Sequence, residues 1–373
     1  MKKKEQPGPK YKVRSQKSEI KKCFASVTLS LRTLREICFL AQRRRDRKEF
    51  YLFLLISFLF ATVGCKEKKS QPQQQETQKQ SPSLPEFNAD SAYEFVKAQT
   101  DYGPRVPNTK AHINCADYLI AKMKIWCDTV VVQSGTLTAF DNTRLNFRNI
   151  ISSFNPQSKK RILLFAHWDT RPWSDQDTAN KDKPSLGADD GASGVAVLME
   201  IARQLQKTKP EIGVDFAFFD AEDWGKEGGS SGAEDSYALG TQYWAKNLHV
   251  NNYTADYGIL LDMVGSKGAQ FRKEGQSKTE AGFVVDKVWQ IATRLGYSSY
   301  FLYEDGGWVT DDHVYVNKIN IPSIDIINSR PETKSGFGQH WHTHGDNMDV
   351  IDRGTLKAVG QTLIGVIFLG EGS

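Results

Sequence analysis

Acidic residues and histidines gather in three short segments that could together hold a metal ion. The segments are residues 188–191 (ADDG), 222–223 (ED) and 341–346 (WHTHGD). Carboxylate oxygen and imidazole nitrogen are both zinc ligands, and a catalytic zinc keeps one coordination position open for water or substrate. Two carboxylates and one neutral histidine would leave such a site without net charge. The pattern therefore indicates a catalytic metal site.

The acidic stretch at residues 218–225 (FFDAEDWG) follows a strand-like apolar run, and its three carboxylates need separate roles. We expect Asp220 to be structural, capping the strand end or hydrogen-bonding the loop. Successive residues of an extended chain face opposite sides, so Glu222 and Asp223 should point different ways. One of them can then hold a metal ion while the other acts on a substrate.

A rival interpretation of residues 187–194 (GADDGASG) is a phosphate-binding loop in front of a helix. The Gly-Lys-Ser/Thr ending of a P-loop is missing, and two carboxylates at this position would repel phosphate. The sequence therefore argues against nucleotide binding at this loop.

Helical and strand-like patterns alternate from residue 86 onward. We expect helices at 89–99, 110–126, 192–206, 237–248, 281–295 and 353–368, and strands at 129–132, 147–152, 161–166, 214–219, 257–263 and 322–327. This alternation predicts an α/β fold, a three-layer sandwich with a mostly parallel central sheet flanked by helices. Ligands of such sheets bind beyond the carboxyl ends of the strands. His167, Asp220 and Asp262 lie at or just after such ends.

The charge of the chain is divided unevenly along its length. The net charge is +5, but the first 64 residues hold 16 Lys and Arg against 5 Asp and Glu, which leaves −6 for the rest. A mildly acidic folded part lacks the basic surface that nucleic-acid binding requires. We expect no nucleic-acid partner.

Residues 1–65 have the features of an export signal. A basic cluster at 43–48 precedes a short apolar run at 51–60 and small residues before a cysteine, which predicts a secretory signal. The end resembles a bacterial lipoprotein cleavage site with Cys65 as the lipidated residue, although Thr62 replaces the usual Leu. We expect an exported protein of the periplasm or cell envelope, lipid-anchored at Cys65. Plain secretion and an uncleaved signal-anchor are alternatives, and a misassigned start codon would explain the residues before the basic cluster.

Residues 66–85 (KEKKSQPQQQETQKQSPSLP) are polar and Gln-rich, so they predict a disordered tether rather than a folded segment. Residues 86–373 are long enough for one well-buried α/β catalytic domain. Only Cys115 and Cys127 fall inside it. Two cysteines make no disulfide framework, and we expect no bridge.

Six motifs in one order closely resemble those of the glutaminyl cyclases. They are FRNIISSFNPQSKKRILLFAHWDTRP, GADDGASG, FFDAEDWG, LLDMVG, TDDHVYV and HWHTHGDN. The resemblance implies an enzyme that cyclises the N-terminal glutamine of peptides and proteins to pyroglutamate and releases ammonia. It also implies the α/β fold that these enzymes share with the two-zinc aminopeptidases.

Those aminopeptidases are the alternative family. Their pattern needs five metal ligands, and the chain offers all of them: His167, Asp190, Asp223, Asp262 and His342. Trp341 in front of His342, the acid-rich segment at 310–313 and the segment at 148–156 are closer to the cyclases. The cyclase resemblance implies one zinc per chain, held by Asp190, Asp223 and His342.

The resemblance also implies catalytic roles. Glu222 would be the proton shuttle, and Asp262 and Asp311 would share its proton or hold the substrate amine; a role for Asp262 in orienting neighbouring groups is the alternative. Trp224 and Trp341 would wall a small apolar pocket for the glutamine side chain. We expect a monomer.

Two departures from the animal cyclases accompany the resemblance. The animal enzymes carry Glu-Glu where this chain has Glu222 and Asp223, and Asp can still coordinate zinc. Ala166 replaces a cysteine of the animal enzymes, so their disulfide has no counterpart here. Neither change removes a catalytic group. His340 and His344 are expected at the rim of the site.

Overall fold

Residues 84–226 and 234–370 are described by a computed structural model of the chain. All of them belong to one unit, residues 80–373. The export signal expected at 1–65 and all but the last two residues of the tether expected at 66–85 lie outside the described residues. These two boundaries, and the start of the catalytic domain at residue 86, therefore stay predictions.

Six strands form the central sheet in the order β1-β2-β4-β3-β5-β8. Strands β4, β3, β5 and β8 run parallel, whereas β2 is antiparallel to both of its neighbours. The strands are β1 (Thr129–Thr138), β2 (Arg144–Phe154), β3 (Arg161–His167), β4 (Gly213–Phe219), β5 (Tyr257–Asp262) and β8 (Ser323–Ile327). The mostly parallel sheet expected from the sequence is confirmed.

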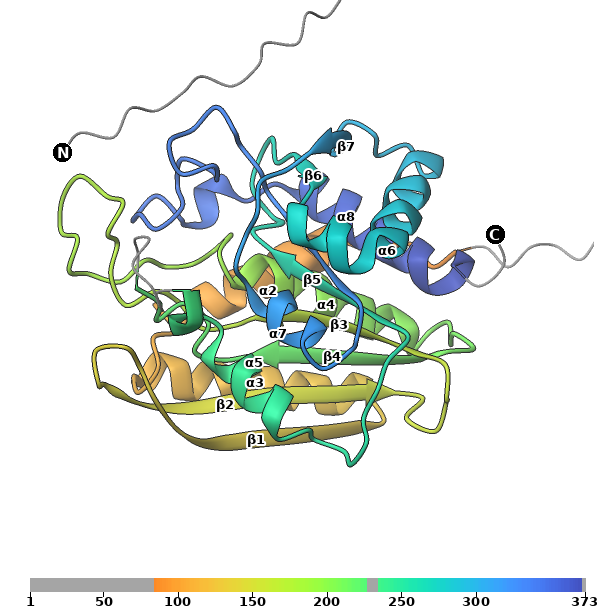
Figure 1. The fold of residues 1–373 in the computed structure, drawn as a ribbon, viewed down its shortest axis with the longest axis horizontal. Helices are drawn as coiled ribbons and strands as arrows, with labels where there is room; N and C mark the ends of the chain where they lie inside the picture. Colours follow the sequence, from red (N-terminus) through yellow and green to blue (C-terminus); the bar gives the residue numbers. More distant parts are fainter. Residues whose placement is uncertain (1–83, 227–233, 371–373) are drawn as a thin grey trace, which may run out of the picture. The chain divides into compact units, whose positions relative to one another are not determined.

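Helices cover both faces of this sheet, as Figure 1 shows. One layer consists of α2 (Ala89–Thr100), α3 (Lys110–Trp126), α4 (Ala192–Leu205) and α8 (Arg353–Leu369), and the other of α5 (Leu239–Lys246) and α7 (Asp312–Asn317). Helix α6 (Gly275–Arg294) packs against β8 and α8. The three-layer sandwich is confirmed.

Smaller elements complete the fold. Strands β6 (Phe271–Lys273) and β7 (Phe301–Asp305) pair in parallel beside α6, and short 3₁₀ helices occupy Glu234–Ser236 and Met348–Val350. Cys115 and Cys127 are both free thiols. Within the described residues, no helix combines the length and the apolar character needed to cross a membrane.

The sheet is apolar on both faces, and this fixes its strands between the two helical layers. Leu164 and Phe216 pack in the cluster that includes α4, whereas Leu163 and Phe165 pack in the cluster that includes α5 and α7. Each such buried side chain contributes about 1.5–3 kcal/mol. Because both faces are covered, the carboxyl ends of β3, β4 and β5 are held rigidly, and these ends carry the site.

Helix α6 begins six residues earlier than its apolar pattern predicts. The carboxylate of Glu274 accepts hydrogen bonds from the backbone N–H of Gln276 at 2.8 Å and of Ser277 at 2.6 Å, which caps the first turn. Ala281, the predicted start, has a non-helical φ of −142° and marks a kink inside the helix. The periodicity thus detected only the segment after the kink.

Candidate functional site

The predicted site residues converge at the carboxyl ends of three neighbouring strands. His167 is the last residue of β3 and Asp262 the last residue of β5, while Glu222 and Asp223 follow β4. Asp190 lies in the loop just before α4. Residues up to 95 positions apart in the sequence are thereby brought into contact.

Two further site residues come from loops beyond the sheet. His342 lies in the long loop between β8 and α8. Asp311 is the N-cap residue of α7, and its carboxylate accepts a hydrogen bond from the backbone N–H of Asp312 at 2.5 Å. The side chains of His342 and Asp311 are both buried.

Three non-glycine residues at the site have their backbone in the left-handed region. They are Ala221 (φ 54°), Met263 (φ 48°) and His342 (φ 53°). Such conformations are uncommon for side-chain-bearing residues and concentrate at functional sites. Here each one lies at or next to a predicted site residue, and Ala221 and Met263 do so where the chain leaves β4 and β5.

The first group of potential metal ligands consists of Asp190, Asp223 and His342, which we name the His342 cluster; their ligand atoms all lie within 4.8 Å of one another. Nε2 of His342 lies 3.4 Å from Oδ1 of Asp223 and 3.8 Å from Oδ2 of Asp190. Ligand atoms at about 2.1 Å from a tetrahedral zinc are about 3.4 Å apart. The donors are therefore spaced to surround an ion, and two carboxylates with one imidazole fit zinc.

Protons compete with a metal ion for the His342 ring. Burial lowers the pKa of His342, but the charge of Asp223 and a hydrogen bond with Asp175 outweigh burial and raise the pKa to about 9. A metal ligand must be deprotonated. Metal affinity at this cluster should therefore fall as the pH falls.

The second group consists of His167, Asp190 and Asp262, which we name the His167 cluster. Nε2 of His167 lies 3.0 Å from Oδ1 of Asp190 and 3.3 Å from Oδ1 of Asp262, which are hydrogen-bonding distances. Burial lowers the pKa of His167, but the neighbouring carboxylates of Asp169, Asp190 and Asp262 raise it well above the usual value. A protonated ring can thus satisfy these carboxylates without a metal ion.

Two buried carboxylates hold the ligand-bearing loops by their backbone; we name them the carboxylate clamps. Asp169 accepts hydrogen bonds from the N–H groups of residues 222 and 223, at 3.0 and 3.2 Å. Asp346 accepts hydrogen bonds from the N–H groups of residues 189 and 190, at 2.7 and 3.1 Å. Each clamp comes from one site loop and fixes another, so the loops position one another.

Arg171 supports the His342 cluster from behind. Its Nη1 donates to Oδ1 of Asp223 at 3.1 Å and to the carbonyl oxygen of the same residue at 3.2 Å. Its Nε and Nη2 donate to both carboxylate oxygens of Asp175, at 2.8 and 3.0 Å. Oδ1 of Asp175 lies 3.4 Å from Nδ1 of His342. One guanidinium therefore orients two of the three ligands, as groups behind metal ligands commonly do.

Glu222 and Asp311 are two further buried acids, and their charges interact with those of the cluster residues, including Asp262 of the His167 cluster. Burial and then the charge of Asp311 raise the pKa of Glu222 well above its usual value. Burial, opposed by a hydrogen bond from His167, raises the pKa of Asp262 to about 7, and burial with the charge of Asp262 raises that of Asp311 to about 7. These carboxyl groups can therefore exchange protons near neutral pH.

Asp220 has the structural surroundings expected for it. It is fully buried and accepts hydrogen bonds from the backbone N–H of Arg148 at 2.6 Å and of Ala221 at 2.8 Å. Its Oδ2 also lies 2.8 Å from Nε2 of His112. These contacts occupy the carboxylate and fix the turn that leads to Glu222.

The two predicted substrate-binding tryptophans lie in different surroundings. Trp341 stacks on the ring of His342, with centroids 3.7 Å apart and an interplanar angle of 23°. Trp224 packs edge-on against Trp173 at 5.9 Å, and its Nε1 lies 3.4 Å from Asp141. The cavity that Trp341 lines is largely polar and is not lined by Trp224, so the shared apolar pocket stays a prediction.

The two histidines expected at the rim have carboxylate partners outside both clusters. Nε2 of His340 lies 2.8 Å from Asp189, and Nδ1 of His344 lies 2.8 Å from Asp177. Neither residue belongs to a ligand cluster among the described residues. His342 is thus the histidine of this motif that belongs to a group of potential metal ligands.

Sequence reasoning did not assign roles to Asp169, Arg171 and Asp346. All three lie inside motifs that were recognised, HWDTRP and HWHTHGDN. The one sign of their importance in the sequence was that each is a charged residue inside a recognised motif and had been given no role. The hydrogen-bond partners of the clamp carboxylates could not be predicted, because these bonds join residues that are 53 to 157 positions apart in the sequence.

Comparisons with known proteins agree with this geometry. The chain matches the model of peptidase family M28 over residues 149–367. It is similar to the crystal structure of the Bacteroides thetaiotaomicron glutaminyl cyclase bound to N-acetylhistamine, with 51% identity and a TM-score of 0.74 over 77% of this chain and 99% of that one. It is also similar to a Zn-dependent exopeptidase from Parabacteroides distasonis, with 55% identity and the same TM-score and coverage.

A more distant similarity links the chain to an animal enzyme. It is 26% identical to the glutaminyl-peptide cyclotransferase of Bos taurus over 243 residues, which is 58% of this chain. The match spans 64% of the length of that relative. The chain therefore spans less than two thirds of the length of this curated relative.

Proposed function

The chain belongs to peptidase family M28 and, within it, to the glutaminyl cyclases, and we propose that it is a zinc-dependent glutaminyl-peptide cyclotransferase. It converts the N-terminal glutamine of peptides and proteins to pyroglutamate and releases ammonia. The observation that carries the proposal is the His342 cluster lying beside three buried acids, Glu222, Asp262 and Asp311. This arrangement combines one ligand set with a proton-transfer group.

The reaction forms one bond and breaks another within the same residue. The neutral α-amine nitrogen attacks the γ-carbonyl carbon, and the bond from that carbon to the amide nitrogen breaks. A proton must leave the amine and another must reach the departing nitrogen. One zinc, held by Asp190, Asp223 and His342, would supply Lewis-acid polarisation of the γ-carbonyl.

Glu222 is the residue placed to move the proton. Burial and the charge of Asp311 raise the pKa of Glu222. A carboxyl group with a raised pKa is a stronger base, and it can both accept and return a proton more readily. As a carboxylate it accepts the proton of the attacking amine, and as a carboxylic acid it returns a proton to the leaving nitrogen. Net proton transfer is zero, so one residue can serve both halves of the reaction.

Asp262 and Asp311 set the charge around Glu222. Both are buried, and the pKa of each is raised to about 7, so the group does not carry three full negative charges at neutral pH. When a proton is held by Asp262 or Asp311, Glu222 can ionise more easily. Whichever of Asp262 and Asp311 is ionised can hold the substrate amine.

The two-zinc aminopeptidase activity is the second candidate, because the His167 cluster supplies a further set of ligand atoms within 4.8 Å. An ammonia-release assay on a Gln-initiated peptide, beside an assay of Leu release from a Leu-initiated peptide, separates the two. We expect ammonia release that a chelator abolishes and zinc restores. Leu release with two bound zinc ions per chain would show the aminopeptidase instead.

Export and lipid anchoring at Cys65 complete the proposal, supported by the order of basic, apolar and small residues in 43–65. This segment lies outside the described residues. Mass spectrometry of the mature protein should find a lipid on Cys65, and Cys65→Ser should release the enzyme from the membrane fraction. We also propose a monomer, which sedimentation equilibrium of the mature domain would test.

A further inference from the structure

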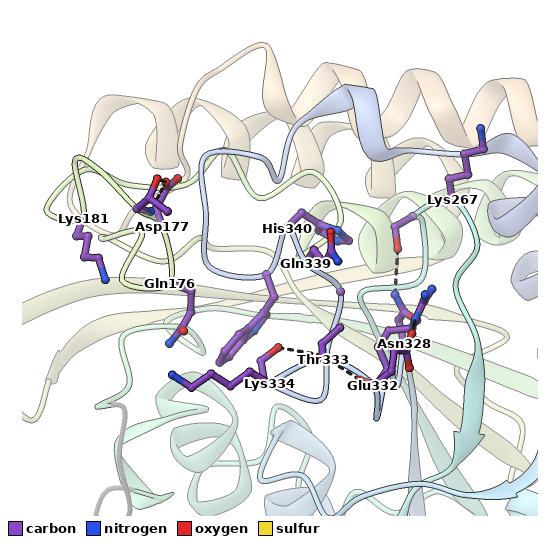
Figure 2. Close-up of a pocket in the computed structure, with 16 residues that line it drawn as sticks. Gln176, Asp177, Lys181, Lys267, Asn328, Glu332, Thr333, Lys334, Gln339 and His340 are labelled. Carbon is purple, nitrogen blue, oxygen red and sulfur yellow. Dashed lines mark hydrogen bonds and ion pairs between the residues drawn. The ribbon is translucent and has the colours of Figure 1, made fainter.

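A groove of about 1010 Å³ extends from the rim of the site. It exceeds the upper end of the roughly 300–1,000 Å³ typical of small-molecule sites, so it is far larger than one glutamine side chain requires. Figure 2 shows the side chains that line it. Its charged lining residues are Asp177, Lys181, Lys267, Arg330, Glu332 and Lys334.

This groove adjoins the loop that carries His342. The backbone N–H of Gln176 donates to the carbonyl oxygen of His342 at 3.2 Å. Trp341 lines the groove and stacks on the ring of His342. A peptide whose first residue is held at the metal site would therefore pass Trp341 to reach the groove.

The groove carries an excess of positive charge. Its lining includes four cationic side chains and two carboxylates, a net of +2. Both carboxylates are already engaged, since Asp177 binds His344 and Glu332 pairs with Arg330 at 2.6 Å. Lys181, Lys267 and Lys334 form no ion pair with any residue in the described ranges.

The three lysines differ in their relation to the site. The Lys334 side chain extends toward Gln176, which adjoins the His342 loop, whereas Lys267 lies at the far end and points away (Figure 2). Nζ of Lys181 donates to the carbonyl oxygen of Asp175 at 3.1 Å, which keeps its charge near the same end as Gln176. Two of the three lysines, Lys334 and Lys181, therefore lie at the end of the groove that adjoins the His342 loop.

We propose that this groove binds the residues that follow the N-terminal glutamine and selects peptides with acidic side chains there. The inference rests on the proposed cyclase activity and names a substrate class for it. Lys334 and Lys181 attract the acidic side chains, and the exposed amides of Gln176 and Gln339 can hydrogen-bond the peptide backbone. Substrates with basic residues at the same positions meet like charge.

The test uses three amidated peptides, Gln-Xaa-Xaa-Ala with Xaa as Glu, Gln or Lys, and the full mature enzyme with zinc. Glu and Gln have the same shape, so their comparison isolates charge. An exposed ion pair changes kcat/KM by up to about fivefold, so we expect the order Glu, Gln, Lys. The preference should shrink as salt is raised, because exposed charges are screened.

Charge reversal locates the preference in the groove. Lys334→Glu should reduce the ratio of kcat/KM for the Glu peptide over the Lys peptide by about threefold or more, and Lys181→Glu should act in the same direction. Lys334→Arg should keep the preference. Lys209→Glu is the matched control, because Lys209 lies in the loop that enters β4 at the opposite edge of the sheet.

The possible results distinguish a failure of the groove proposal from a failure of the proposed cyclase activity. Equal kcat/KM for the three peptides, or a preference that survives both reversals unchanged, would overturn the groove assignment while ammonia release upheld the cyclase. Absence of ammonia release from every peptide would overturn the proposed function, and this inference with it.

Discussion

The His342 cluster and the His167 cluster share Asp190 and use the same residue types, but they differ in spacing. In the first, the imidazole nitrogen lies 3.4 and 3.8 Å from the carboxylate oxygens. In the second, it lies 3.0 and 3.3 Å from them. The wider spacing suits ligands around an ion, and the narrower spacing suits hydrogen bonds.

The surroundings of the two clusters differ as well. Arg171 and Asp175 brace the carboxylate and the imidazole of the His342 cluster. The His167 ring instead has Asp169 3.6 Å from its Nδ1, which is too far for a hydrogen bond. Ligand types alone therefore do not fix the number of metal ions, because two sets of the same residue types differ in spacing and in supporting contacts.

The largest effect, loss of zinc and of activity, should come from removing His342. Removing His167 is the matching change in the other cluster and should spare the zinc. His342→Ala should lose the bound zinc and slow cyclisation by about a thousandfold or more, since the Lewis acid contributes several kcal/mol. His167→Asn should keep one zinc per chain. Metal analysis of the purified proteins, with ammonia release, measures both. Two zinc ions in the unaltered protein, or loss of zinc from His167→Asn, would contradict the distinction.

Removing the proton carrier should leave the metal in place. Glu222→Gln should slow cyclisation by about 10²- to 10⁴-fold, the usual contribution of a positioned acid or base, with zinc content unchanged. Glu280→Gln, an exposed change on α6, is the matched control and should be neutral. Retention of more than about a hundredth of the rate would show that another group moves the proton.

A smaller effect is expected where the His342 cluster is braced. Arg171→Gln should weaken zinc binding by about 10- to 100-fold, as loss of such partners commonly does. Competition with a fluorescent chelator measures the affinity of the folded protein. Arg161→Gln removes an arginine paired with Asp215 at the start of β3 and should leave zinc affinity unchanged. Equal affinities for both variants would show that Arg171 does not orient the ligands.

The smallest effect concerns pH. Cyclisation needs Glu222 ionised, so kcat/KM falls on the acid side as Glu222 is protonated. The charge of Asp311 helps to raise the pKa of Glu222, and Asp311→Asn should therefore lower that pKa and move the acid limb to lower pH. The pH of half-maximal kcat/KM is the measurement, with Asp256→Asn at the opposite end of β5 as control. A limb that stays in place or moves upward would rule out this coupling.

Much of the fold could be predicted because its strands are buried. The expected strand at 161–166 differs by one residue from β3 (Arg161–His167), since continuous apolar runs mark strands covered on both faces. The expected strand at 129–132 is shorter than β1 (Thr129–Thr138), because the second half of this exposed edge strand is polar. Helix α7 was missed since its six residues are too few for a helical pattern.

Part of the site could also be predicted from the sequence, and part could not. The residues whose chemistry is visible in the motifs, such as Asp190, Asp223 and His342, could be named from the sequence, and the structure brings them together. The carboxylate clamps could not be predicted, because they accept hydrogen bonds from backbone N–H groups, and almost every residue type has such a group. Such contacts leave no recognisable pair in the sequence.

The clamp formed by Asp346 also ties function to the order in which the chain is synthesised. The loop that it holds is made 157 residues earlier, and His342 precedes the clamp by only four positions. A nascent or clipped chain that ends before this point has most of the sheet but neither the imidazole ligand nor the group that fixes the Asp190 loop. Such a chain should therefore neither bind zinc at this cluster nor cyclise glutamine.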